Sequence, residues 1–384
     1  MKYLIIKSYL LAALILVSCD AVNEMQLQSN SAIAIPSELV IPFRYTKKLV
    51  VVHAHLNDSK TANSFIFDTG AFQSKIEYQL AQYLQLETHS KRDNGTAQGV
   101  KREIEITSVD TIGLSSAKFF NIGAGKLQYD KKSYSPCIAK DGIIGANLIK
   151  LAHWKIDYKN KKIHVSKDPF VLNNENNQYE LEFTTSFLSG VPEINIEIDG
   201  RIIKDVIFDI GYNGGLIVPN RFAEQFHSEN SQTIIDQSTA GIFGSKRDTL
   251  QVKELPVKLG EYKTHIPVEF SSVNKALLGN DFLEHFTIYL NYDEDTITLV
   301  PTSSVEIDKT KMFVPGILND SLWIVNRTKP YIPLQIGDTL KTINGKRPKE
   351  VFNSHCDYFM KYSEFIKADT LKVETIKGNK IRIK

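Results

Sequence analysis

Two aspartates of this sequence stand in similar settings, each at the end of an apolar run and each two residues before a glycine. Asp68 lies in "FIFDTGAFQSKI" (65–76) and Asp209 lies in "IFDIGYNGGLIV" (207–218). A lone exposed aspartate has a pKa of about 3.9 and is a poor acid at neutral pH. Two carboxyls in hydrogen-bond contact share one proton, so one can accept a proton from water while the other donates to a carbonyl oxygen.

Strands and tight turns must bring these two aspartates together. The residues before each one read as a hairpin of two alternating strands around a polar turn, "KLVVVHAHLNDSKTANSFIFDTG" and "VPEINIEIDGRIIKDVIFDIG". A short helical pattern follows each, with apolar residues four apart (Ile76, Leu80 and Leu84; Phe222 and Phe226). The glycine after each aspartate allows the backbone to bend tightly toward its partner.

The similarity extends over both halves of the chain. After each helical pattern come a polar loop with glycine (94–106 and 238–252), an apolar pair ending in Gly145 or Gly279, and a further hairpin. The two aspartates lie 141 positions apart and the two closing glycines 134. These ordered features predict an internal duplication, with lobes at 39–170 and 171–303. The alternative is unrelated β-rich sequence whose strands and turns look alike.

Residues 40–300 resemble a two-lobed aspartic protease of the retropepsin-like kind, the family that is the established example of a shared-proton carboxyl pair. The matching residues are Asp68, Thr69, Gly70 and Ala71 in the first motif, Asp209 and Gly211 in the second, and Ile143, Ile144, Gly145, Leu277, Leu278 and Gly279 in the closing elements. The resemblance implies an all-β, bilobal acid-protease β-barrel fold with short helices. It also implies catalytic roles for Asp68 and Asp209, supported by the residues around them.

The second motif departs from the family pattern. Ile210 replaces the expected threonine, and Tyr212 stands where a small residue is expected. Losing one bridging hydroxyl costs about 0.5–1.5 kcal/mol, which weakens the junction of the lobes and leaves both carboxylates in place. Tyr212 could fill part of the cleft.

The resemblance also implies two hairpin flaps, mobile loops that cover a bound peptide. They fall at 94–102 and 238–247. The residues expected at their tips are Thr96, Ala97, Gln98 and Gly99 in the first, and Ala240, Gly241, Ile242 and Phe243 in the second.

These features predict an aspartic endopeptidase that uses water, with no cofactor, no metal and no covalent intermediate. Both aspartates belong to one chain, so a monomer suffices, and the partner is a peptide or protein substrate. The alternative is a weak or inactive protease-fold protein that binds peptides, because Ile210 and Tyr212 depart from the pattern. A sugar-cleaving carboxylate pair fits less well, since aromatic residues for stacking sugars do not gather near either motif.

The N-terminus reads as an export signal. "MKYLIIKSYLLAALILVSC" has two lysines, a short apolar run and an ending that resembles the bacterial lipobox, which implies cleavage before Cys19 and its lipidation. Residues 1–19 are therefore predicted to be a lipoprotein signal and 20–38 a tether. The protein would then be exported and anchored by lipid in the bacterial cell envelope, at the outer membrane or periplasmic face. A plain signal peptide is the alternative.

A third region, 304–384, reads as a separate α+β domain. "IGDTLKTINGKRPKEV" (336–351) resembles the core of PDZ domains, and "ADTLKVETIKGNKIRIK" resembles their closing hairpin. The resemblance implies a peptide ligand that adds to a sheet edge, with a carboxylate-binding loop near Pro315, Gly316, Ile317 and Leu318. A small accessory domain without a ligand is the alternative.

Composition limits the remaining options. Lys and Arg number 46 against 44 Asp and Glu, and the net charge of +2 gives no support for a nucleic-acid partner. Besides Cys19, the cysteines are Cys137 and Cys356, far apart in sequence and expected to be free buried thiols although export permits a disulfide. His53 and His55 share one face of a strand, and two polar residues on a half-exposed strand account for them better than a metal pair.

Overall fold

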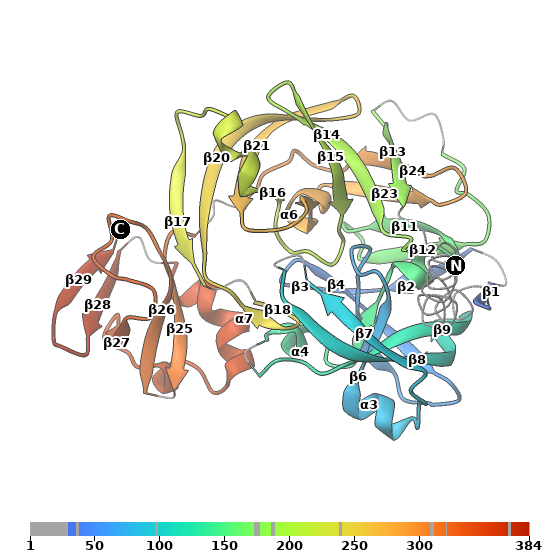
Figure 1. The fold of residues 1–384 in the computed structure, drawn as a ribbon, viewed down its shortest axis with the longest axis horizontal. Helices are drawn as coiled ribbons and strands as arrows, with labels where there is room; N and C mark the ends of the chain where they lie inside the picture. Colours follow the sequence, from blue (N-terminus) through green and yellow to red (C-terminus); the bar gives the residue numbers. More distant parts are fainter. Residues whose placement is uncertain are drawn as a thin grey trace, which may run out of the picture.

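The computed structural model describes residues 30–35, 38–96, 99–131, 133–172, 177–185, 189–237, 240–307, 311–319, 321–367 and 370–383. Strands make up 51% of the structure and helices 11%. The expected all-β class is therefore confirmed at this level. Two β-rich lobes lie against each other, and a third region packs beside them (Figure 1).

The first lobe carries a strand before and after each of its expected turns. Its strands are β3 (Arg44–Thr46), β4 (Leu49–Leu56), β5 (Asn63–Phe67), β6 (Ser74–Glu77), β7 (Ser90–Gly95), β8 (Lys101–Leu114), β9 (Ala117–Leu127) and β10 (Gly142–Ile144). Its helices are short: α3 (Tyr78–Tyr83), α4 (Ser135–Ile138) and α5 (Ala146–Ile149). The expected hairpin before Asp68 is present, with Val51 opposite Ile66 and His53 opposite Ser64.

The second lobe repeats these elements in the same order. They are β14 (Pro192–Ile198), β15 (Arg201–Phe208), β16 (Leu216–Pro219), the 3-10 helix η1 (Asn220–Gln225), β17 (Gln232–Asp236), β18 (Ala240–Gly241), β19 (Gly244–Ser245), β20 (Asp248–Leu259), β21 (Tyr262–Ser271), β22 (Leu277–Leu278) and α6 (Asn280–Leu283). In both lobes the strand that ends at the aspartate pairs in parallel with the strand that ends at the closing glycine, β5 with β10 and β15 with β22. This repetition is what a duplicated chain would give.

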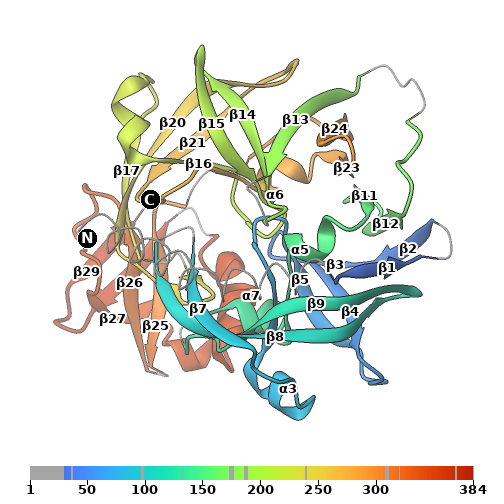
Figure 2. The same cartoon turned by 45° about the vertical axis from the view of Figure 1, so that its right-hand side comes forward.

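A sheet that contains strands of both halves joins the lobes (Figure 2). Its successive pairs are β2 (Leu39–Pro42) with β12 (Lys162–Ser166), β12 with β11 (His153–Asp157), β11 with β23 (Phe286–Asn291), β23 with β24 (Thr296–Pro301), and β24 with β13 (Tyr179–Thr185). Alternating apolar residues of these strands enter one core that is continuous between the lobes. The bases of the two lobes are thus fixed to each other.

The strands of the C-terminal region continue the sheet of the second lobe, and the region has its own core. Its elements are β25 (Val314–Asn319), β26 (Leu322–Thr328), β27 (Thr339–Ile343), the 3-10 helix η2 (Pro348–Glu350), α7 (His355–Phe365), β28 (Leu371–Thr375) and β29 (Lys380–Ile383). The buried Trp323 stacks on Phe365 of α7 at the centre of this core. β26 also pairs with β17, Ile235 opposite Thr328, and so attaches this region to the second lobe.

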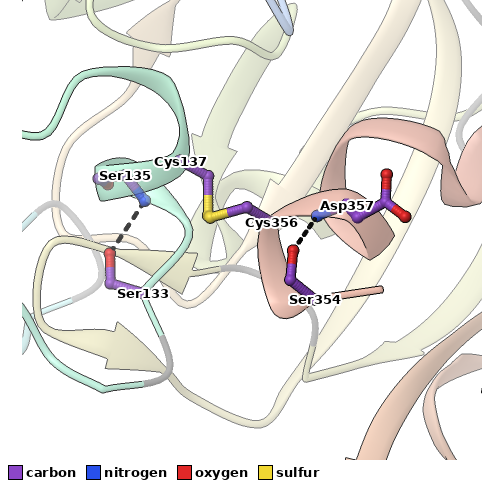
Figure 3. Close-up of a disulfide and its surroundings, with 6 residues drawn as sticks. All are labelled: Ser133, Ser135, Cys137, Ser354, Cys356 and Asp357. Carbon is purple, nitrogen blue, oxygen red and sulfur yellow. Dashed lines mark hydrogen bonds between the residues drawn. A yellow bond between two sulfur atoms is a disulfide. The ribbon is translucent and has the colours of Figure 1, made fainter. Parts of the chain in front are cut away.

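The prediction of two free thiols was wrong, because Cys137 and Cys356 form a disulfide. Cys137 lies on α4 of the first lobe and Cys356 lies on α7 (Figure 3). Their Cα atoms are 5.2 Å apart although 219 positions separate them in the sequence. Sequence distance does not decide disulfide pairing, since the fold alone brings the two helices together.

The segment predicted as a tether is only partly described, and part of it is not a linker. Ala32–Ala34 form β1, which pairs with the edge of β9, Ala32 opposite Phe120. Ile33 packs against the main core, which explains the attachment. The signal residues 1–19 and Cys19 lie outside the described residues. None of the described helices has the length and apolar character needed to cross a membrane.

Candidate active site

The two aspartates occupy equivalent places at the meeting point of the lobes. Asp68 follows β5, and its amide donates to the carbonyl oxygen of Ile144 at 2.9 Å. Asp209 follows β15, and its amide donates to the carbonyl oxygen of Leu278, also at 2.9 Å. Each aspartate is thus held by the strand that ends at the closing glycine of its own lobe, as the duplicated motifs predict.

The carboxyl of each aspartate lies against the glycine of the other loop. A side-chain carbon at Gly70 would lie 2.5 Å from the carboxyl carbon of Asp209, and one at Gly211 would overlap the Asp68 carboxyl in the same way. The two carboxyls also hydrogen-bond to each other. The glycines are therefore required for close approach, and the predicted pair is present.

Thr69 ties the two loops together. Its buried hydroxyl donates to the carbonyl oxygen of Phe208 at 2.6 Å and accepts from the amide of Ile210 at 2.9 Å. Both partners belong to the second lobe, so one side chain of the first lobe satisfies two backbone groups across the junction. Thr69 therefore bridges the two loops.

Ile210 makes no equivalent bridge, since its side chain is apolar, and it is completely buried in the core instead. The side-chain amide of Asn280 donates to the Ile210 carbonyl oxygen at 2.6 Å and to the Lys48 carbonyl oxygen at 2.7 Å. Tyr158 donates to the side-chain oxygen of Asn280 at 2.6 Å. The second loop is therefore supported by an amide from its own closing element, a residue that the motif comparison missed.

The ring of Tyr212 packs against two glycines, and the residue also lines the cleft. Its ring lies against Gly214 and Gly279, where a side chain on either glycine would overlap it. It also lines the cleft described below. The tyrosine thus replaces a small residue with a ring that is accommodated by two neighbouring glycines.

The two carboxyls differ in their electrostatic surroundings. Burial raises the pKa of both above the ordinary range of aspartate, and the negative charge of Asp68 raises the pKa of Asp209 further. The positive charge of Lys75 and the amide of Ala71, which donates to Asp68 Oδ1 at 2.7 Å, oppose the rise at Asp68. The surroundings therefore favour ionisation of Asp68 over ionisation of Asp209.

A cleft of about 860 Å³ opens over the pair. Residues of both lobes and of the C-terminal region line it. Asp68, Gly70, Asp209 and Gly211 lie together among them, so that the carboxyls are accessible to a molecule in the cleft. Apolar side chains such as Ile66 and Leu277 also line it.

The first expected flap is a hairpin, formed by β7 and β8, that reaches across this cleft. Thr96 lines the cleft, and a side-chain carbon at Gly99 would lie 3.2 Å from the side-chain nitrogen of Asn274 in the second lobe. Ala97 and Gln98 lie outside the described residues.

The second expected flap is the small hairpin of β18 and β19, and it reaches the first lobe. Gly241 and Ile242 line the cleft, and the Ile242 carbonyl oxygen accepts from the amide of Asp130 at 3.2 Å. Phe243 packs into a buried cluster of the first lobe and lies under the guanidinium of Arg102, 5.2 Å from ring centroid to carbon. Of Ala240 only the backbone is described, in β18.

One wall of the cleft comes from the C-terminal region, which the sequence did not indicate. Tyr358, Phe359 and Tyr362 of α7 line it together with Val314 of β25. Tyr134 of the first lobe stacks on Phe359 with ring centroids 4.6 Å apart, beside the disulfide. An aromatic pattern on a helix gives no indication of which cleft it faces, so only the fold places it here.

The structure also shows where the two histidines of the first lobe lie and identifies a lysine that the sequence comparison missed. His53 and His55 are both exposed on β4, away from the aspartate pair, and His55 contacts the Ser59 carbonyl oxygen at 3.3 Å. Lys75 was missed, although it is buried and lines the cleft with Asp68. Lys75 lies on β6 between Ser74 and Ile76, which are buried as well, and a lysine within such a strand is the signal that could have indicated a functional residue.

No protein-family model matches this chain, and no curated protein matches its sequence at a significant level.

Proposed function

We propose that this chain is an aspartic endopeptidase with a bilobal acid-protease fold. The observation that carries the proposal is the contact of the Asp68 and Asp209 carboxyls at the base of a cleft between two equivalent lobes. Burial of a carboxyl is costly, and strongly perturbed pKa values cluster at functional sites, so such a pair is a candidate for acid and base catalysis. Both come from one chain, which supports a monomer as the active unit.

The arrangement supports a division of roles in peptide hydrolysis. Ionised Asp68 accepts a proton from a bound water as the water oxygen attacks the peptide carbonyl carbon. Protonated Asp209 donates to the carbonyl oxygen, where negative charge develops. The resulting tetrahedral intermediate breaks when the leaving nitrogen takes a proton from the pair, and the carboxyls return to one shared proton.

The two hairpins supply cover for a bound peptide. Thr96 of one hairpin and Gly241 and Ile242 of the other line the cleft, and Gly99 lies near Asn274 of the second lobe. Closure of such lids excludes water other than the attacking one and orients the peptide bond. This supports roles as flaps for 94–102 and 238–247.

We propose that 304–384 is a PDZ-like domain that extends the peptide site. The expected carboxylate-binding residues lie within strand β25, and the Tyr358 hydroxyl already donates to the Pro315 carbonyl oxygen. A peptide end captured by a free loop at this place is therefore not supported. Val314 of β25 and Tyr358, Phe359 and Tyr362 of α7 line the cleft over the aspartates, which favours a role of this region in holding the peptide that the aspartates would cleave.

Export and lipid anchoring at Cys19 remain part of the proposal. The disulfide between Cys137 and Cys356 supports export, because disulfides persist in oxidising compartments outside the cytosol. Mass spectrometry of the mature N-terminus, with and without a Cys19→Ala substitution, tests the anchor directly.

The first test is binding of a pepstatin-type inhibitor, whose hydroxyl takes the place of the attacking water between the carboxyls. We expect it to raise the melting temperature of the native protein and to leave that of Asp68→Asn unchanged. A peptide library analysed by mass spectrometry then tests cleavage. Absence of both inhibitor binding and products between pH 3 and pH 8 would contradict the proposal.

The second candidate is a protein that binds peptides without cutting them, favoured by Ile210 and Tyr212 in the second loop. It predicts tight peptide binding in calorimetry and no products from the library. Ile210→Thr separates the two cases, since a rise in turnover from a measurable baseline would mean that the site is catalytic and only imperfectly held.

A further inference from the structure

A buried lysine lies beside the aspartate pair. Lys75 stands on β6, seven positions after Asp68, and only 5% of its surface is exposed. Its ammonium group donates to the carbonyl oxygen of Gln73 at 3.2 Å, and the residue lines the cleft together with Asp68. A buried ammonium group is costly, so its position calls for a charged partner or a function.

The sheet register identifies the residue that takes this position in the other lobe. Lys75 pairs with Ile143 on β10, and Ile217 pairs with Leu277 on β22, the strand equivalent to β10. Ile217 is buried in a small apolar cluster with Leu277 and Val273. The fold therefore accepts an apolar side chain at this place, and the first lobe has a lysine instead.

Two other buried lysines show what a purely structural ammonium group contacts. Lys126 on β9 donates to Thr88 at 2.7 Å and lies 3.4 Å from Glu105, and Lys253 donates to the carbonyl oxygens of Ala223 and Phe226. Each has two strong partners. Among the described residues the Lys75 ammonium donates to one neutral acceptor, and Asp68 is the negative group that favours its charged form.

Burial lowers the pKa of Lys75 to about 8, with Asp68 opposing the shift and Arg92 adding to it. The group is thus still charged at neutral pH. The charged and titratable groups around Lys75 and the pair are Asp68, Asp209, Arg92 on β7, Tyr158 and Tyr212.

We propose that Lys75 is a positioning residue that keeps Asp68 ionised and so assigns the shared proton to Asp209. This inference rests on the proposed function, because it gives the two carboxyls of that site unequal roles. The lysine acts through Asp68 and needs no contact with substrate. Its absence from the second lobe makes the site asymmetric where the backbone is nearly symmetric.

The test compares the pH dependence of kcat/KM for the native protein, Lys75→Met and Lys75→Ile, with Lys126→Met as the matched control. Lys75→Met removes the charge and keeps the length, and Lys75→Ile copies the residue of the second lobe. In both, kcat/KM on the acid side should fall about tenfold because a neighbouring cation shifts a carboxyl's ionisation by this much or more. The maximal value of kcat/KM should change little in both Lys75 variants, and Lys126→Met should keep the pH profile of the native protein. An unmoved acid side in both variants would overturn the inference.

A measurement without substrate separates this inference from the proposed function. In the native protein the carboxyl carbon resonance of Asp68 should respond to a titration near pH 8 as Lys75 loses its proton, and Lys75→Met should abolish that response. If the protein cleaves no peptide but shows this response, the proposed function fails and the electrostatic coupling stands. If peptides are cleaved and the response is absent, the inference fails alone. The native protein decides the matter even if both variants fail to fold.

Discussion

The loop after Asp68 and the loop after Asp209 have equivalent backbone hydrogen bonds and differ in their side chains. The amide of Ala146 donates to the Ala71 carbonyl oxygen at 2.8 Å, and the amide of Asn280 donates to the Tyr212 carbonyl oxygen, also at 2.8 Å. Each aspartate likewise receives support from the equivalent strand of its own lobe. The backbone arrangement that positions the aspartate carboxyl is therefore the same in both lobes.

The side chains divide the remaining tasks between the loops. The first loop supplies the hydroxyl of Thr69, which binds two backbone groups of the second. The second loop has the buried Ile210, and its carbonyl oxygen depends on Asn280. Near-symmetry of the backbone is enough to bring two carboxyls together, whereas the unequal side chains around them give the two carboxyls different electrostatic surroundings.

The strongest way to break the comparison is to remove one carboxyl at a time. Asp68→Asn and Asp209→Asn should each lower kcat/KM by at least about a thousandfold, because neither base nor acid can act alone. Steady-state cleavage of a library-derived peptide measures both. The double variant should be no worse than either single one, and substantial activity in one single variant would mean that the carboxyls do not act as a unit.

The next largest effect is expected from the glycines that allow the carboxyls to meet. Gly70→Ala would place a carbon against the Asp209 carboxyl and Gly211→Ala would place one against that of Asp68. We expect each to reduce kcat/KM about a hundredfold or more, since small displacements of a catalytic group are costly. Gly200→Ala is a control, because no atom lies within 4 Å of the added carbon, although its positive φ gives some strain. Equal activity in Gly70→Ala and Gly200→Ala would contradict the close approach.

The bridging hydroxyl gives a smaller effect and sharpens the difference between the loops. Thr69→Ala should lower the free energy of unfolding by about 1–3 kcal/mol, because it leaves the Phe208 carbonyl and the Ile210 amide without this partner. Urea denaturation measures the loss. Thr69→Ser keeps the hydroxyl and should retain most of the stability, so an equal loss in both would assign the effect to the methyl group.

The smallest effect concerns the pH dependence of stability. Both carboxyls have a pKa raised by burial, so the folded state retains protons that the unfolded chain has released. Their contribution to stability is full below the ordinary aspartate pKa of about 3.9 and is lost as the pH rises through the folded-state pKa. An asparagine at either position does not titrate, so it avoids this pH-dependent loss of stability.

Asp209→Asn should therefore raise the melting temperature at pH 7 by a few degrees, and by more than Asp68→Asn, because the pKa of Asp209 is raised further. The difference between the variants should shrink near pH 3. A reversed order at pH 7 would place the shared proton on Asp68.

The sequence predicted the pair and its frame because both depend on local patterns. Alternating apolar residues, an Asp-Gly turn and a glycine two positions after each aspartate are visible within about twenty residues, and they recur at nearly constant spacing. The hairpins of 94–102 and 238–247 were placed by the same comparison. The assignment of the shared proton was not predictable, since it depends on charges that only the folded chain brings near.

Three features depended on contacts between distant segments. The lysine at position 75 reads as an ordinary strand residue until the register sets it opposite Ile143. The pairing of Cys137 with Cys356 requires that α4 and α7 meet. The strand Ala32–Ala34 lies in a segment of small polar character, and it is ordered only because the edge of β9 offers it partners.

The disulfide, finally, limits how the two lobes could move apart. The C-terminal region is bonded to the first lobe through Cys356 and shares a sheet with the second through β26, so it links the two lobes along the wall of the cleft that α7 and β25 form. Together with the sheet that fixes the bases of the lobes, this link would restrict widening of the cleft to the parts that the C-terminal region does not line. If the chain cleaves peptides as proposed, a polypeptide would enter at those parts, where loose chain ends and long unstructured loops fit more easily than the rigid surface of a folded domain.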